Sequence, residues 1–113
     1  MPYIEIKTNT EVKPAAVTAF NTVFPEIIGQ IPGKTEAKLM FSIEGGLNMY
    51  FAGSDSPCAI ATVSLFGKST REAYDEFTAS LTLFIQNLLS IPSSRIYVKY
   101  EEVSTWGRDG KNF

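Results

Sequence analysis

Apolar residues follow two patterns along the chain, the alternation typical of strands and the spacing of three or four typical of helices. Alternation at residues 3–8 puts Ile4 and Ile6 on one face of a predicted strand. A predicted helix follows, with Pro14 in its first turn and an apolar stripe formed by Val17, Phe20, Phe24, Ile27, Ile28 and Ile31. Because a proline inside a helix removes a backbone hydrogen bond, Pro25 predicts a kink or an early end of this helix.

The middle of the chain predicts strands separated by turns. A second strand is predicted at residues 38–43, where Leu39, Phe41 and Ile43 share a face, and a turn at residues 44–46 ends it. A further short strand is predicted at residues 47–51. After a polar loop, residues 58–66 are apolar at nearly every position, which predicts a strand buried on both faces.

The last third of the chain predicts a helix, a strand and a tail. Ser69 and Glu72 have the S-x-x-E spacing of a capping box, so a second helix is predicted to begin there and to run to about Ser90. Its predicted apolar stripe consists of Ala73, Phe77, Leu81, Phe84 and Leu88. A strand is predicted at residues 95–100, with Ile96 and Val98 facing inward, and residues 103–113 are predicted to form an irregular tail.

The two halves of the chain match each other in the order strand, helix, Ile-Pro pair, strand. The pairs Ile31-Pro32 and Ile91-Pro92 stand sixty residues apart, which indicates a weak internal repeat of a βαβ unit. Because such crossovers are right-handed, two units in one sheet place both helices on the same side. The predicted fold is therefore a single α+β domain over residues 1–113, with a four-stranded mixed sheet and two helices on one face. The other face carries apolar residues without cover, which predicts an oligomer that packs its sheets inward.

Composition excludes several kinds of chemistry. The 113 residues contain no histidine and one cysteine, so Ser-His-Asp and Cys-His catalysis are excluded, and no metal or other cofactor is expected. With ten basic residues against twelve acidic ones there is no basic stripe, so nucleic acid is not an expected partner. No stretch reaches the roughly twenty apolar residues that span a bilayer, so no membrane association is expected. The first residues lack the pattern of a signal peptide, and the cytosol is the expected compartment.

Several short motifs follow one another in a fixed order: Pro2 at the start of a strand, Gly33-Lys34, Phe51-Ala52-Gly53-Ser54, Pro57-Cys58-Ala59, Ser64-Leu65-Phe66-Gly67, Arg95-Ile96-Tyr97-Val98, Trp106-Gly107 and Asn112-Phe113. Together they resemble the macrophage migration inhibitory factor family from end to end. The resemblance implies the tautomerase fold assembled as a homotrimer, which agrees with two βαβ units and a bare sheet face. It also implies an isomerase of the phenylpyruvate tautomerase or L-dopachrome isomerase type, acting on small α-keto acids or dopachrome-like compounds.

The resemblance further implies that Pro2, exposed as the N-terminus once Met1 is removed, is the general base. An α-amino group in water has a pKa of roughly 8, and burial or a nearby cation lowers that pKa towards neutrality, where a base works best. Lys34 is the expected cation, and it could hold the carboxylate of the substrate or the developing enolate. If Met1 is retained, the Pro2 nitrogen is a tertiary amide and is not a base.

Six further residues are expected to bind substrate by the same resemblance. Phe66, Trp106 and Phe113 would form apolar walls, and Tyr97 of a neighbouring subunit would donate a hydrogen bond from its hydroxyl. Lys38 and Lys99 depart from the animal members of the family, which have tyrosine and asparagine at these positions. Their added positive charge is expected to favour acidic substrates.

Each of these residues has another interpretation without the resemblance. Lys34 could be a cation near a helix C-terminus, and Tyr97 could be a core or interface aromatic residue. Trp106 and Phe113 could pin the tail against a neighbouring subunit. Cys58 is interpreted as a buried apolar residue, because the C-x-x-C redox motif of the family is missing. The alternative function is a secreted, cytokine-like protein that binds a receptor of the family's type, which would need export without a signal peptide.

Overall fold

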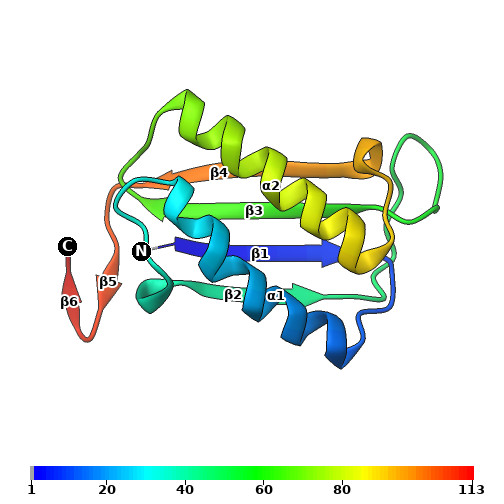
Figure 1. Ribbon diagram of the computed structural model, residues 1–113, viewed down its shortest axis with the longest axis horizontal. Coiled ribbons are helices and arrows are strands. Elements are labelled where there is room, and N and C mark those ends of the chain that lie inside the picture. Colours follow the sequence, from blue (N-terminus) through cyan, green and yellow to red (C-terminus); the bar gives the residue numbers. More distant parts are fainter. Residues whose placement is uncertain (1) are drawn as a thin grey trace.

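The computed structural model describes residues 2–113, in which a four-stranded sheet carries two helices on one face (Figure 1). Met1, whose removal the predicted chemistry requires, lies outside the described residues. Strand β1 (Pro2–Thr8), helix α1 (Pro14–Ile27) and strand β2 (Met40–Glu44) form one βαβ unit with parallel strands. Strand β3 (Ala59–Phe66), helix α2 (Arg71–Leu89) and strand β4 (Ile96–Val103) form the other. Antiparallel pairing of β1 with β3 joins the units in the order β2-β1-β3-β4, which confirms the predicted fold class.

The core lies between the sheet and the two helices. Every second residue of β1 and β3 is buried beneath the helices, and each large side chain buried there contributes about 1.5–3 kcal/mol. These residues pack with one another and with the inner faces of the helices: Ile4, Ile6, Ala61, Val63, Leu65, Phe20, Phe24, Phe77 and Leu81. The prediction that residues 58–66 are buried on both faces is wrong for the single chain. Ile60, Thr62, Ser64 and Phe66 are only half-buried, because no second layer covers that face.

Helix α1 ends as its proline predicts. Pro25 lies inside the last turn, the α-helix stops at Ile27, and a 3-10 turn at Ile28–Gln30 continues the chain. A second 3-10 turn, Glu36–Lys38, precedes the strand, so β2 begins at Met40 and the predicted start at Lys38 is wrong. The consequence is that Lys38 belongs to a tight turn at the edge of the sheet rather than to a strand.

Helix α2 differs from its prediction in its cap and in its buried stripe. The N-cap is Thr70 rather than Ser69, and its hydroxyl oxygen accepts a hydrogen bond from the backbone N–H of Ala73 at 3.1 Å. The fully buried stripe consists of Ala73, Phe77, Leu81, Ile85 and Leu89, whereas the predicted Phe84 and Leu88 are only partly buried. The stripe advances in steps of four and winds around the helix, because the surface beneath it is a twisted sheet together with α1.

Two tyrosines attach α2 to β4. The rings of Tyr74 and Tyr100 lie 4.4 Å apart, and the Tyr74 hydroxyl donates to a carboxylate oxygen of Glu102 at 2.6 Å. Burial raises the pKa of both phenols, so both remain neutral hydrogen-bond donors near physiological pH.

The loop before β3 is held by side-chain hydrogen bonds to backbone, and the strand predicted at residues 47–51 is absent. The only pairing there is a single bridge between Phe51 and Ser54. Arg95 reaches into the loop and donates to four carbonyl oxygens, those of Phe51, Ser54, Ser56 and Pro57, at 3.0–3.1 Å. Asn9 also donates to the carbonyl oxygen of Asp55, at 2.9 Å. Such contacts between distant residues leave no local sequence pattern.

The tail is a hairpin, so the prediction of an irregular tail is wrong. Strands β5 (Gly107–Arg108) and β6 (Lys111–Asn112) pair antiparallel around Asp109 and Gly110. Both turn residues have positive φ, 53° and 76°, as a two-residue type I′ turn requires. The Asp-Gly pair is the strongest short hairpin signal in the sequence, and it identifies this turn in retrospect.

Replacing Thr70 by alanine is expected to lower the free energy of unfolding by about 1 kcal/mol, because the N–H of Ala73 loses its acceptor. Ser69→Ala is the matched control, since Ser69 contributes its backbone N–H, which donates to the Tyr74 hydroxyl at 2.9 Å. Urea unfolding followed by circular dichroism measures both. A larger loss in Ser69→Ala than in Thr70→Ala would contradict this assignment of the cap.

Candidate active site

Pro2 is the first residue of β1 and lines a cavity at that end of the sheet. It is buried, and it pairs with Leu65 near the end of β3. The cavity has a volume of about 410 Å³ and is also lined by Lys38, Trp106 and Arg108. Three segments distant in sequence form it: the start of β1, the turn before β2, and the hairpin, which lies beside the start of β1 in Figure 1.

Lys34 lies on the β3 side of Pro2. Its ammonium nitrogen donates a hydrogen bond to the backbone carbonyl oxygen of Phe66 at 2.9 Å, and Phe66 directly follows the strand partner of Pro2. Among residues 2–113, no carboxylate oxygen lies within 4.0 Å of this nitrogen. The ammonium group is therefore held at the end of β3 without a counter-charge, and it can accept an anionic group of a ligand.

The hairpin brings aromatic residues to the same end of the sheet. The ring of Phe113 lies 5.9 Å from that of Phe66, and the Phe113 backbone N–H donates to the carbonyl oxygen of Trp106 at 2.9 Å. The hydrogen bond closes the hairpin, and the aromatic contact connects the tail to the end of β3. The structure therefore brings together Pro2, Lys34, Lys38, Phe66, Trp106 and Phe113, six of the eight predicted site residues.

Tyr97 and Lys99 are not part of this assembly within one chain. Tyr97 pairs with Ile60, whereas Pro2 pairs with Leu65, five residues further along β3 and thus about 17 Å away. Tyr97 is 60% exposed, and its ring contacts that of Phe51 at 4.9 Å. Lys99 lies 3.6 Å from a carboxylate oxygen of Glu101. If either residue serves the cavity at Pro2, it does so from a neighbouring chain.

Arg108 lines the cavity and was missed by the sequence prediction. It lies on β5 just before the Asp-Gly turn, and its side chain is exposed at the rim of the cavity that it lines. Treating the tail as irregular hid its position. The turn signal could have placed Arg108 and Lys111 opposite each other on a hairpin, but not beside Pro2.

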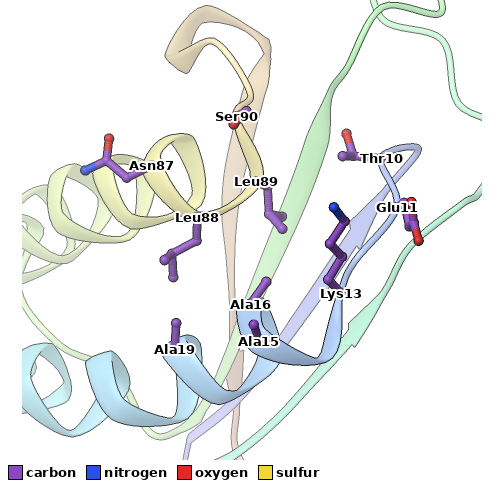
Figure 2. Close-up of a pocket in the computed structure, with 10 residues that line it drawn as sticks. All are labelled: Thr10, Glu11, Lys13, Ala15, Ala16, Ala19, Asn87, Leu88, Leu89 and Ser90. Carbon is purple, nitrogen blue, oxygen red and sulfur yellow. The ribbon is translucent and has the colours of Figure 1, made fainter.

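A second, larger cavity lies at the opposite end of β1. It has a volume of about 570 Å³ and lies between the start of α1 and the end of α2 (Figure 2). Figure 2 shows Ala16, Ala19 and Leu88 lying between the two helices. Its lining contains no residue predicted to take part in catalysis, whereas the cavity at Pro2 is lined by Pro2, Lys38 and Trp106. The cavity at Pro2 is therefore the candidate active site.

Within the described chain, no three His, Cys, Asp or Glu side chains are grouped so as to bind a metal ion. Neither α1 nor α2 is long and apolar enough to cross a membrane.

Two βαβ units joined through antiparallel first strands, with a buried Pro2 at a cavity beside a lysine, define a small protein of the tautomerase fold. The chain belongs to the macrophage migration inhibitory factor family, whose model, described as Macrophage migration inhibitory factor (MIF), matches residues 1–112. The predicted family is thereby confirmed.

Individual relatives match the chain over its whole length. It is 26% identical to a macrophage migration inhibitory factor homolog of Brugia malayi, with 100% of this chain and 99% of that protein covered. It is 25% identical to D-dopachrome decarboxylase-B of Xenopus laevis, with 99% and 94% covered. Among solved structures, Leishmania major MIF2 superposes with a TM-score of 0.93 at 24% identity, covering 100% of this chain and 97% of that one. The homologue from Prochlorococcus marinus gives a TM-score of 0.83 at 25% identity, covering 98% of both chains.

Replacing Phe113 by alanine is expected to loosen the hairpin and expose Trp106, because the contact with Phe66 is lost. Trp106 is the only tryptophan, so its fluorescence reports on the cavity alone. The emission of Phe113→Ala should shift to longer wavelength and be quenched more strongly by acrylamide. Leu83→Ala is the matched control, because Leu83 on α2 is 53% exposed against 56% for Phe113. Identical emission in both variants and the wild type would contradict the assigned contact.

Proposed function

We propose that the protein is a keto–enol tautomerase that acts on small α-keto acids such as phenylpyruvate, or on dopachrome-like compounds, with Pro2 as its general base. The observation that carries this proposal is the position of Pro2, buried at a cavity and next to the strand end where Lys34 holds its ammonium group. Membership of the family and the similarity to a protein named D-dopachrome decarboxylase-B support it.

The proposed reaction moves one proton between carbon and oxygen. The nitrogen of Pro2 removes a proton from the carbon next to the carbonyl group, and the electron pair of that C–H bond moves to form an enolate. Lys34 stabilises the negative charge or binds the adjacent carboxylate, and the proton is then delivered to oxygen to give the enol. Substrate and product have the same atoms, so the reaction needs no cofactor.

This chemistry requires a free, neutral amine at Pro2. Burial and the nearby Lys34 ammonium both disfavour the protonated amine, so its pKa is expected to lie below the roughly 8 of an exposed α-amino group. Catalysis should therefore be retained at neutral pH and be lost as the pH falls through this pKa. The chain must have lost Met1, because a tertiary amide nitrogen accepts no proton in this range.

We further propose that the working unit is a homotrimer whose sheets face inward. The sheet face opposite the helices is uncovered, and it carries exposed apolar side chains such as Met40 and Tyr97, 66% and 60% exposed. Packing against a neighbouring chain would bury them and would bring Tyr97 and Lys99 of that chain to the cavity at Pro2. The Tyr97 hydroxyl would then donate a hydrogen bond to the substrate.

The receptor-binding alternative has no specific residue pattern that favours it over catalysis. It stays a prediction, as does the cytosolic location with or without export.

A free Pro2 nitrogen is expected to raise the rate of phenylpyruvate tautomerisation by about 10²–10⁴-fold, the usual contribution of a positioned base. The matched pair is one protein carrying a cleavable N-terminal tag, assayed before and after the cut that exposes Pro2. Intact mass establishes the N-terminus of each sample, and ultraviolet absorbance follows the enol. Pro2→Gly should fall between the two, since a primary amine remains. Equal rates before and after cleavage would refute Pro2 as the base.

Mixed trimers test whether Pro2 and Tyr97 act across an interface. Pro2→Gly and Tyr97→Phe chains, each with a lowered rate, should regain activity when unfolded together and refolded as a mixture. Some interfaces then combine an intact Pro2 with an intact Tyr97. Light scattering establishes the trimer. A mixture whose rate is only the average of the two variants would show that the two residues do not share a site across chains.

A further inference from the structure

The cavity at Pro2 carries more positive charge than a base and one carboxylate require. Lys38 and Arg108 both line it, and Lys34 lies at the neighbouring strand end. Glu36 and Asp109 are close in sequence, yet within residues 2–113 no carboxylate oxygen lies within 4.0 Å of any of these three cations. The chain as a whole has a formal net charge of −2, so the charge of this cluster is opposite in sign to the net charge of the chain. Uncompensated cations in a concave site attract anions.

The three cations lie on two sides of Pro2. The Lys34 ammonium group donates a hydrogen bond to the Phe66 carbonyl oxygen at the end of β3. Lys38 lies on the other side, just before β2, which pairs with β1 from Tyr3 onward. Strand β1 runs between them, so the two sides are two strand spacings apart, about 10 Å. The lysine on the β3 side and the cations on the β2 side therefore lie on opposite flanks of the strand that carries Pro2.

Apolar side chains share the lining of this cavity with Pro2 and the two outer cations. Leu39, Met40 and Trp106 line it together with Lys38 and Arg108. An apolar wall suits a hydrocarbon or aromatic skeleton, and a guanidinium group suits a carboxylate, which it binds with two parallel hydrogen bonds. The cavity therefore offers apolar walls for a substrate skeleton and two cations for an anionic group, in addition to Lys34 at the neighbouring strand end.

We propose that the cavity selects keto acids with a second, distal carboxylate, which Lys38 and Arg108 bind while the keto acid group lies at Pro2 and Lys34. This inference rests on the proposed tautomerase function and specifies its substrate class. Lys38 and Arg108 are specificity-determining residues in it, because they contact the part of the substrate that does not react.

The test compares 4-carboxyphenylpyruvate with phenylpyruvate, which differ only by the distal carboxylate. The wild type is expected to favour the dianion in kcat/KM. Lys38→Gln and Arg108→Gln should each reduce that preference by about tenfold, mainly through a higher KM for the dianion. The preference should also weaken with added salt. Lys13→Gln removes one positive charge, also exposed, at the other end of the molecule, and it should leave the preference unchanged.

Binding of unreactive analogues separates this inference from the proposed function. Calorimetry with 4-carboxycinnamate and cinnamate measures the same preference without any turnover. Tighter binding of 4-carboxycinnamate than of cinnamate by the wild type, with loss of this difference in Arg108→Gln, supports the inference. This holds even if neither keto acid is turned over, a result that would contradict only the proposed function. Equal binding of both analogues, or a preference that both glutamine variants retain, overturns the inference even if phenylpyruvate is a substrate.

Discussion

The antiparallel pairing of β1 with β3 is the interaction on which the rest of the structure depends. It joins two βαβ units into one sheet, and its register places Pro2 opposite Leu65. Phe66 and the lysine bonded to its carbonyl oxygen thereby come next to Pro2. A slip of one residue would turn Ile4 and Ile6 away from the helices, so burial of the core enforces the same register that assembles the site.

The same topology leaves the site incomplete in one chain. Right-handed crossovers place α1 and α2 on one face, so the opposite face of the sheet has no cover of its own (Figure 1). Tyr97 lies on that sheet about 17 Å along β3 from Pro2, too far for a hydroxyl to reach a substrate bound there. Assembly through the open face would bring Tyr97 of one chain next to Pro2 of another. The proposed trimer and the proposed activity therefore depend on each other.

Charge is distributed unevenly over this small acidic chain. Ion pairs are few among the described residues, and the long cationic side chains are used in other ways. Arg95 binds four backbone carbonyl oxygens of one loop, and Lys34 binds one at the end of β3. Lys38 and Arg108 remain available at the cavity, because no acidic side chain within residues 2–113 pairs with them. Cations that do not neutralise a carboxylate of the protein can bind one of a ligand.

The sequence by itself determined the features that repeat locally. Period and alternation predicted the four main strands and both helices, the two Ile-Pro pairs predicted the repeat, and Pro25 predicted the early end of α1. Composition excluded histidine chemistry, and ordered motifs predicted the family and the residues around Pro2. Only the tertiary structure decided that Thr70 rather than Ser69 caps α2, how the buried stripe of α2 winds over a twisted sheet, and where the tail lies. It alone placed Arg108 at the cavity and Tyr97 far from it, because contacts between distant segments depend on register and packing that no local pattern records.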